Sequence, residues 1–162
     1  MQLFLLAFSL ANAWQSAASQ AVIATRGAGS DIPQSLVINP VTNMTYVLIL
    51  ADGYGGEHNS VEVIDGNNNI VAGIQAGFND GDYGGPVGIA VNPATNKIYI
   101  VNFCGNDPYC NDPGTVTVID GSTNNTTTVT VGYLPYGVAV NSVTEQSLRF
   151  KCLRQPPLLP RS

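Results

Sequence analysis

A repeated unit of about 50 residues constrains the fold of this chain more than any other feature. The string Pro-Val-Gly-Ile-Ala-Val-Asn-Pro begins at Pro86, a variant begins at Pro135, and a looser copy begins at Pro33. Three more segments of strand-like composition follow the copy at Pro33 and the copy at Pro86. The middle segment of each three ends in Val-Ile-Asp-Gly. Repeats of about this length with four strands are typical of β-propeller blades.

Each unit predicts four antiparallel strands joined alternately by tight turns and longer loops. In the second unit, residues 98–101 are apolar on both faces, as expected for a strand between two neighbouring blades. Residues 128–131 alternate Thr and Val, which is typical of a strand half exposed at the rim. The predicted fold class is all-β, a β-propeller fragment built of four-stranded antiparallel blades.

Two aspartates, Asp65 and Asp120, each precede a glycine at the end of the third predicted strand. Asp-Gly is a turn-forming pair, because Asp accepts hydrogen bonds from nearby backbone N–H groups and Gly tolerates positive φ. We therefore interpret both carboxylates as turn caps rather than as catalytic groups, and expect Gly121 to supply the positive φ.

The unit resembles the repeat of the YVTN β-propeller family, which is named for a Tyr-Val-Thr-Asn string on its second strand. The matching string here is Tyr-Ile-Val-Asn, ending at Asn102, and the strings Gly-Ile-Ala-Val-Asn-Pro and Thr-Val-Thr-Val-Ile-Asp-Gly also fit. The first unit departs from the pattern, with Tyr-Val-Leu-Ile at that place. The resemblance implies a propeller fold on an exported or cell-surface protein.

The repeat divides the chain into segments of different expected role. The expected segments are a signal peptide over 1–13, an N-terminal lead-in over 14–30 that could serve as an outer strand of a closing blade, blade 1 over 31–85, blade 2 over 86–134, the first strand of blade 3 over 135–144, and an aberrant tail over 145–162. The chain therefore contains about two blades and one further strand.

Export is predicted from the N-terminus and from two cysteines. Residues 3–10 form an apolar run, and Ala-Asn-Ala at 11–13 fits a signal cleavage pattern, although no basic residue precedes the run. Cys104 and Cys110 bracket a turn-forming string and could form a disulfide in an oxidising compartment. The expected location is secreted, periplasmic or cell-surface; a frayed N-terminal extension is the alternative interpretation of residues 1–13.

The tail differs in charge from the rest of the chain. Residues 1–144 contain two basic and ten acidic side chains, whereas residues 145–162 contain four basic and one acidic. A one-base shift of the reading frame at codon 145 permits Asn-Lys-Val-Tyr-Val-Ser-Asn, which is the expected second strand of blade 3. The hypothesis is a frame change at this codon, and a natural disordered tail is the alternative.

Isolated blades cannot bury both of their faces, because each blade packs against the next. Propellers close with about four to eight blades. Two blades therefore leave apolar faces exposed, and such faces favour association. The sequence predicts either a piece of a larger ring or self-association through these faces.

The longer loops are all expected at one end of the blades, where binding residues commonly collect on a rigid scaffold. They are rich in acidic and aromatic side chains and contain no Lys or Arg. The candidate binding face consists of Tyr54, Glu57, His58, Asp80, Asp82, Tyr83, Asp107, Tyr109 and Asp112. A protein or a glycan is the expected partner; solvated turns without a ligand are the alternative.

Composition and motifs exclude several classes of function. Only 10% of residues are charged and the net charge is −5, so a nucleic-acid partner is not expected. No apolar run is long enough to span a bilayer. No nucleophile elbow, histidine cluster or complete calcium loop is present, so we expect no catalysis, metal or cofactor. The alternatives are a piece of a lactonase- or lyase-like propeller enzyme and a truncated product without function.

Overall fold

The computed structural model describes residues 32–50, 59–77, 85–105, 107, 110–141 and 148–152. Ten strands and no helix occur in these residues. The strands are β1 (Ile32–Asn39), β2 (Met44–Leu50), β3 (Ser60–Ile64), β4 (Ile70–Gln75), β5 (Pro86–Asn92), β6 (Lys97–Asn102), β7 (Thr115–Asp120), β8 (Thr126–Thr130), β9 (Pro135–Val140) and β10 (Leu148–Cys152). Accordingly, the described chain includes no helix that could cross a membrane.

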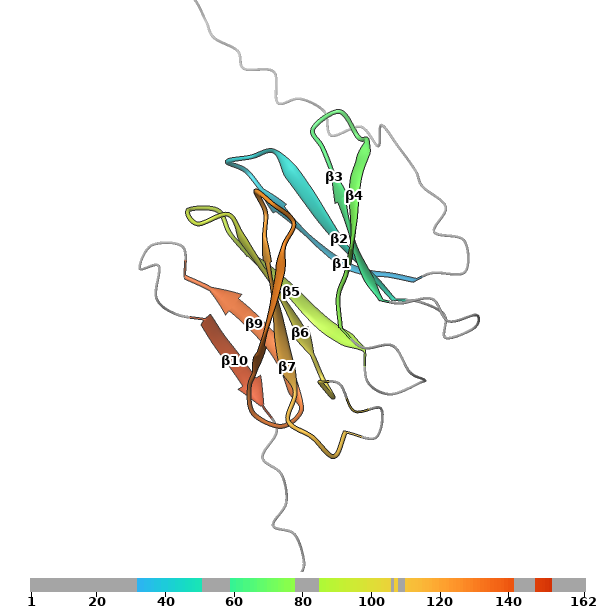
Figure 1. The fold of residues 1–162 in the computed structure, drawn as a ribbon. Coiled ribbons are helices and arrows are strands. Elements are labelled where there is room, and N and C mark those ends of the chain that lie inside the picture. Colours follow the sequence, from blue (N-terminus) through green and yellow to red (C-terminus); the bar gives the residue numbers. More distant parts are fainter. Residues whose placement is uncertain are drawn as a thin grey trace, which may run out of the picture.

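The strands form two four-stranded antiparallel sheets, which we call sheet 1 (β1–β4) and sheet 2 (β5–β8), and a two-stranded sheet of β9 and β10. In each four-stranded sheet the spatial order equals the chain order, so every strand pairs with its sequence neighbours. This arrangement confirms the predicted all-β fold class and is consistent with two propeller blades. Figure 1 shows the sheets following one another, and β1 contacts β5 as β5 contacts β9.

The two four-stranded sheets have the same internal register. Val37 lies opposite Tyr46 in sheet 1, and Ala90 lies opposite Tyr99 at the same position of the repeat in sheet 2. Side chains of a strand alternate between the two faces of a sheet. The shared register therefore assigns equivalent residues of the two units to equivalent faces.

The core lies between the two sheets. Tyr46, Leu48 and Val61 of sheet 1 are fully buried together with Ile98 and Ile100 of sheet 2. On the other face of β6, Val101 is also fully buried. The expectation that β6 is apolar and enclosed on both faces is therefore confirmed, and burial of this apolar area is the main favourable term that holds the sheets together.

Strand β8 differs from its prediction. All five of its residues, Thr126–Thr130, are exposed, whereas the alternation of Thr and Val predicted a strand buried along one face. The reason is that β8 is the last strand of sheet 2, and the following strand, β9, contacts β5 and β6 instead.

The turn between the first and second strands is built in the same way in both four-stranded sheets, around an asparagine at the end of the first strand. Asn39 Oδ1 accepts a hydrogen bond from Val41 N at 3.0 Å, and Asn92 Oδ1 accepts one from Ala94 N at 3.0 Å. Each turn ends in an asparagine with positive φ, 56° at Asn43 and 51° at Asn96. Asparagine tolerates this left-handed conformation better than most residues, which explains its place at both turn ends.

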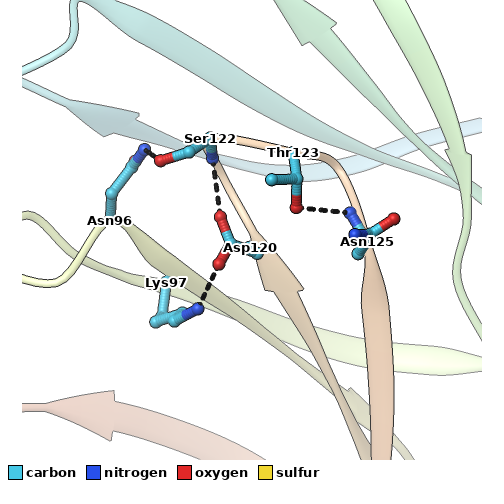
Figure 2. Close-up of polar contacts among 6 residues, drawn as sticks. All are labelled: Asn96, Lys97, Asp120, Ser122, Thr123 and Asn125. Carbon is cyan, nitrogen blue, oxygen red and sulfur yellow. Dashed lines mark hydrogen bonds and ion pairs between the residues drawn. The ribbon is translucent and has the colours of Figure 1, made fainter.

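The interpretation of the two aspartates as turn caps is confirmed. Asp65 Oδ1 accepts hydrogen bonds from the backbone N–H groups of Asn67 and Asn69 at 2.9 and 2.8 Å. Asp120 Oδ1 accepts one from Ser122 N at 2.9 Å, as Figure 2 shows. Both carboxylates therefore cap their own turns, as the Asp-Gly string predicts.

The expected conformation of Gly121 is wrong. The positive φ in this turn is at Asn124 (60°), and the equivalent residue in sheet 1 is Asn68 (66°). Gly121 is required for another reason, because a Cβ atom there would lie 2.5 Å from Asn96 Oδ1 and 2.7 Å from the Tyr46 hydroxyl. Only glycine lets the two sheets approach this closely.

The tail contributes a strand. Leu148–Cys152 forms β10 and pairs antiparallel with β9, in the place that the second strand of a third unit would occupy. Leu148 lies opposite Val140 and Arg149 opposite Ala139. This segment of basic composition is thus joined to the repeat by backbone pairing.

Candidate functional site

The long connections gather at one end of the sheets, because β2, β4, β6 and β8 all finish there and β3, β5, β7 and β9 all begin there. The expected division between a loop end and a turn end is therefore present. Seven predicted site residues, Tyr54, Glu57, His58, Asp80, Asp82, Tyr83 and Tyr109, lie outside the described residues. Of the predicted binding face, Asp107 and Asp112 can be placed.

A disulfide closes the loop between β6 and β7, as the cysteine spacing predicted. Cys104 and Cys110 are joined, with their Cα atoms 4.4 Å apart. Backbone hydrogen bonds from Asp107 N to Cys104 O and from Cys110 N to Asp107 O, both 3.1 Å, fold the chain between them. A disulfide on this loop is compatible with an oxidising, extracellular location.

The two acidic residues of this loop have different surroundings. Asp107 Oδ2 accepts a hydrogen bond from Asn111 N at 2.5 Å, so its carboxylate helps to fix the loop around the disulfide. Asp112 is exposed to solvent. Asp107 thus holds the loop in place, and Asp112 presents a negative charge at the loop end.

A cavity of about 210 Å³ opens beside this loop, between the end of β4 and the strands of sheet 2. Every described residue that lines it is uncharged, and almost all of these residues carry hydroxyl or amide groups. They are Gln75, Gly77, Asn102, Thr117, Thr126 and Thr128. The described part of the lining therefore offers hydrogen-bond donors and acceptors.

Asn102 is the most constrained polar side chain of this cavity. It is 1% exposed, and its Nδ2 donates to the hydroxyl oxygens of Thr115 and Thr117 at 3.1 and 3.0 Å. Among the described residues, its Oδ1 has no hydrogen-bond partner. A buried acceptor without a partner costs about 1–3 kcal/mol, so a bound donor would be favourable there.

Gly77 brings the backbone of sheet 1 to this amide. Its φ is 77°, and a Cβ atom would lie 2.6 Å from Asn102 Oδ1. Any other residue would be strained by the backbone angle and would clash with the amide. The sequence therefore keeps this wall of the cavity free of a side chain.

Sequence reasoning identified neither Asn102 nor the threonines as site residues. Asn102 is the last residue of the string that carries the family resemblance, and the corresponding residue of sheet 1 is Ile49. That exchange of an apolar residue for an amide at a strand end was the available signal. Thr117 could not be found in this way, since its role depends on the packing of the two sheets.

The opposite end of the sheets carries an ion pair. Lys97 Nζ lies 2.5 Å from Asp120 Oδ2, as Figure 2 shows. This bond, with the N–H of Ser122, holds the pKa of Asp120 below its ordinary value of 3.8. Both side chains are about one third exposed. The pair belongs to the turn that follows β7, so we assign it a structural role.

The described residues contain no group of three or more His, Cys, Asp or Glu side chains that could hold a metal ion. No protein-family model matches the chain, and no curated protein matches it. The resemblance to YVTN propellers therefore rests on the repeat residues themselves.

Proposed function

We propose that this chain is a non-catalytic, exported β-propeller repeat protein of the YVTN type, which binds a neutral glycan at its loop end. The observation that carries this proposal is the cavity beside the disulfide loop. Its described lining is uncharged and rich in hydroxyl and amide groups, and it includes Asn102, whose Oδ1 has no hydrogen-bond partner among the described residues. A sugar hydroxyl is a neutral donor of the kind that this oxygen lacks.

The fold supports a binding role rather than catalysis. Strands paired along their length hold the cavity walls, and rigid elements position binding groups more accurately than loops do. General acid–base chemistry needs a titratable side chain within hydrogen-bond reach of the substrate. The described residues that line the cavity provide none. The disulfide supports the export part of the proposal, because such bonds persist in oxidising compartments.

Titration calorimetry with neutral oligosaccharides tests the proposal, and Thr128→Leu is the informative variant. Thr128 lines the cavity and is exposed, so the larger apolar side chain should fill the site without disturbing the core. We expect affinity to fall at least about tenfold, equivalent to about 1.4 kcal/mol.

The matched control is Thr127→Leu. Thr127 is the neighbouring residue of β8, is equally exposed and points to the other face of sheet 2. Its substitution should leave binding unchanged. Equal losses in both variants, or no binding of any neutral oligosaccharide by the unmodified chain, would contradict the proposal.

A further inference from the structure

Three Asn-x-Thr motifs lie in the turns of the two four-stranded sheets. They begin at Asn43, Asn124 and Asn125, and none has a proline in the middle position. In an exported protein this motif is the acceptor sequence for N-linked glycosylation. A motif of three residues also arises by chance, so the surroundings of each asparagine decide whether it can be used.

All three motifs lie at the turn end of the sheets, opposite to the long loops. Asn43 ends the turn from β1 to β2, and the other two motifs begin in the turn from β7 to β8. Figure 1 shows both turns at the same end of the sheets. Both motifs of the second turn include Thr126, which lines the cavity. The motif at Asn43 shares no residue with the described lining, so it is independent of the candidate site.

Asn43 and Asn96 occupy the same position of the repeat, but their surroundings differ. Asn96 Oδ1 accepts a hydrogen bond from Asn39 Nδ2 at 2.8 Å, and Asn96 Nδ2 donates to Ser122 Oγ at 3.3 Å (Figure 2). Asn96 is therefore half-buried where sheet 1 meets sheet 2. Asn43 is exposed, because the described strands include no sheet that precedes sheet 1. The residue that is used for packing in sheet 2 is thus accessible in sheet 1.

The third position of the motif differs between the two sheets as well. Thr45, two residues after Asn43, is half-buried at the start of β2, whereas its equivalent in sheet 2 is Ile98, which is fully buried in the core. Thr45 lies opposite Ile38, which is 55% exposed. Sheet 1 therefore has the hydroxyl that completes the acceptor motif at a position where sheet 2 has a core residue.

The turn after β3 leaves room for the amide nitrogen of Asn43. A Cβ atom at Gly66 would clash with Asn43 Nδ2, so any other residue there would displace the amide or cover it. Because glycine has no side chain, the nitrogen that would receive a sugar has one group fewer around it.

We propose that Asn43 is an acceptor for N-linked glycosylation when the chain is exported. This inference rests on the export part of the proposed function and not on glycan binding in the cavity. The donor would be an oligosaccharide linked through phosphate to a membrane lipid, and a transferase would join the two. A bond forms between Asn43 Nδ2 and the anomeric carbon, the bond from that carbon to the phosphate oxygen breaks, the lipid phosphate leaves with the electron pair, and Nδ2 loses one proton.

Transfer with purified components tests the proposal on the full chain. The chain is incubated with an oligosaccharyltransferase and a lipid-linked oligosaccharide, and its intact mass is measured before and after treatment with peptide N-glycosidase. That treatment converts a glycosylated asparagine to aspartate, so peptide mass spectrometry identifies the acceptor. We expect Asn43 to be modified. The reaction requires no export, and the calorimetry described above measures cavity binding separately, so failure of one proposal does not imply failure of the other.

Two substitutions at Thr45 form a matched pair. Thr45→Ala removes the hydroxyl of the motif and should abolish modification of Asn43, whereas Thr45→Ser keeps the hydroxyl and should restore it. Both variants place a smaller side chain at the same half-buried position, and circular dichroism checks that both fold. The proposal is overturned if Asn43 stays unmodified while a peptide with an Asn-x-Thr motif is modified in the same reaction, or if Thr45→Ala is modified as fully as Thr45→Ser.

A second motif in the same sheet tests whether an accessible amide matters. Val71→Thr makes Asn69 the first residue of an Asn-x-Thr motif, and Val71 is 51% exposed, so the change should be tolerated. Asn69 is exposed too, but its Nδ2 donates to Asp65 Oδ2 at 3.1 Å. We expect several-fold less modification at Asn69 than at Asn43, relative to short peptides of the two motifs. Equal relative modification would show that the structure around Asn43 does not favour it, which contradicts the argument.

Discussion

Asn39 Nδ2 donates a hydrogen bond of 2.8 Å to Asn96 Oδ1, which joins the first turn of sheet 1 to the equivalent turn of sheet 2. Asn39 is fully buried, and its Oδ1 is already used by Val41 N within its own turn. A single amide therefore caps a turn with its oxygen and links two sheets with its nitrogen. Asn96 continues this chain of contacts by donating to Ser122 Oγ at 3.3 Å.

The change Asn39→Asp should weaken the contact between the sheets without opening the turn. The carboxylate keeps an acceptor for Val41 N, but it replaces the donor to Asn96 with an oxygen that faces another oxygen. We expect the free energy of unfolding in urea to fall by about 1–3 kcal/mol.

The control is Asn96→Gly, which keeps the positive φ and removes the acceptor. In a chain that already carries Asn96→Gly, Asn39→Asp should lower the free energy of unfolding by less. Equal costs in both backgrounds would show that the bond contributes nothing.

The Tyr46 hydroxyl and Gly121 form a second contact between the sheets. The hydroxyl is buried without a hydrogen-bond partner among the described residues. We expect Tyr46→Phe to raise the free energy of unfolding by up to about 1 kcal/mol, and Gly121→Ala to lower it by about 1–3 kcal/mol. Gly73→Ala is the matched control, since a Cβ there has nothing within 4 Å. Chemical denaturation measures all three, and a stable Gly121→Ala variant would disprove the close approach.

Burial raises the pKa of Tyr46 above 10.0, and the nearby charge of Asp120 raises it further. A raised folded-state pKa for an acid means that the neutral form is the one the fold favours. The associated stability is fully present below pH 10 and is lost as pH rises through the folded-state pKa. We therefore expect the free energy of unfolding to fall less steeply with rising pH in Tyr46→Phe than in the unmodified chain. Fluorescence-detected denaturation at increasing pH measures the difference, and identical profiles would contradict it.

Asp65 and Asp120 should control stability in acid. Hydrogen bonds from Asn69 hold the pKa of Asp65 below 3.8, and the Lys97 ammonium does the same for Asp120. Because both pKa values are lowered by folding, their contribution is complete above about pH 5 and is lost as pH falls below about 4. Asp65→Asn and Asp120→Asn should each flatten this acid limb of the stability profile.

The control for the acid limb is Asp112→Asn. Asp112 is exposed to solvent and lies outside both Asp-Gly turns. Its substitution changes the net charge as Asp65→Asn does but removes neither turn cap, so it controls for overall charge. A slope that is equally flat in all three variants would mean that overall charge, and not the two turn caps, governs the acid response.

Reduction of the disulfide should loosen the loop beside the cavity. Cys104 and Cys110 are six residues apart, and closing a loop of this length contributes about 2 kcal/mol by restricting the unfolded chain. We expect the double change Cys104→Ser and Cys110→Ser to lower the free energy of unfolding by about this amount. Added reductant should then have no further effect, whereas it should destabilise Cys152→Ser, in which the pair is intact. Insensitivity of the unmodified chain to reductant would contradict the prediction.

Local features of this fold could be predicted from the sequence, and features that depend on packing between sheets could not. Asp65 was identified as a turn cap because its hydrogen bonds reach only four residues along the chain. The Lys97–Asp120 pair was missed, since it joins residues 23 apart through the strand register. The role of Gly121 was mistaken for the same reason. Its constraint comes from Tyr46, on the other sheet.

In the candidate site, too, the local feature could be predicted from the sequence and the feature that depends on packing between sheets could not. The disulfide was predictable because a short string of turn-forming residues separates Cys104 from Cys110. The cavity was not, because Gln75 belongs to sheet 1 and Thr128 to sheet 2, and period-two alternation does not say which faces meet. An unexpected amide at Asn102, where the other unit has Ile49, was the single sequence signal for a polar site there.

The register of the β9–β10 hairpin differs by one residue from that of both four-stranded sheets. Val37 and Ala90 each lie opposite a residue nine positions later, Tyr46 and Tyr99. Ala139 occupies the same position of the repeat, yet it lies opposite Arg149, ten positions later. A shift of one residue moves every side chain of a strand to the other face. The tail therefore pairs with β9 without reproducing the faces of a blade.

This offset makes the frame-change hypothesis testable at the level of structure. Replacing residues 145–151 with Asn-Lys-Val-Tyr-Val-Ser-Asn includes the change Leu148→Tyr, nine positions after Ala139. We expect the replacement to restore the register of the other sheets, because a tyrosine between two β-branched residues would then stand where Tyr99 stands between Ile98 and Ile100 in β6. Cross-strand nuclear Overhauser contacts of Ala139 measure the outcome: they should reach position 148 in the replaced chain and position 149 in the unmodified one.

A scrambled string of the same composition is the control, since it keeps the β-propensity but not the order. If the replaced chain retains position 149 opposite Ala139, the hidden string is not the missing strand and the match is coincidental.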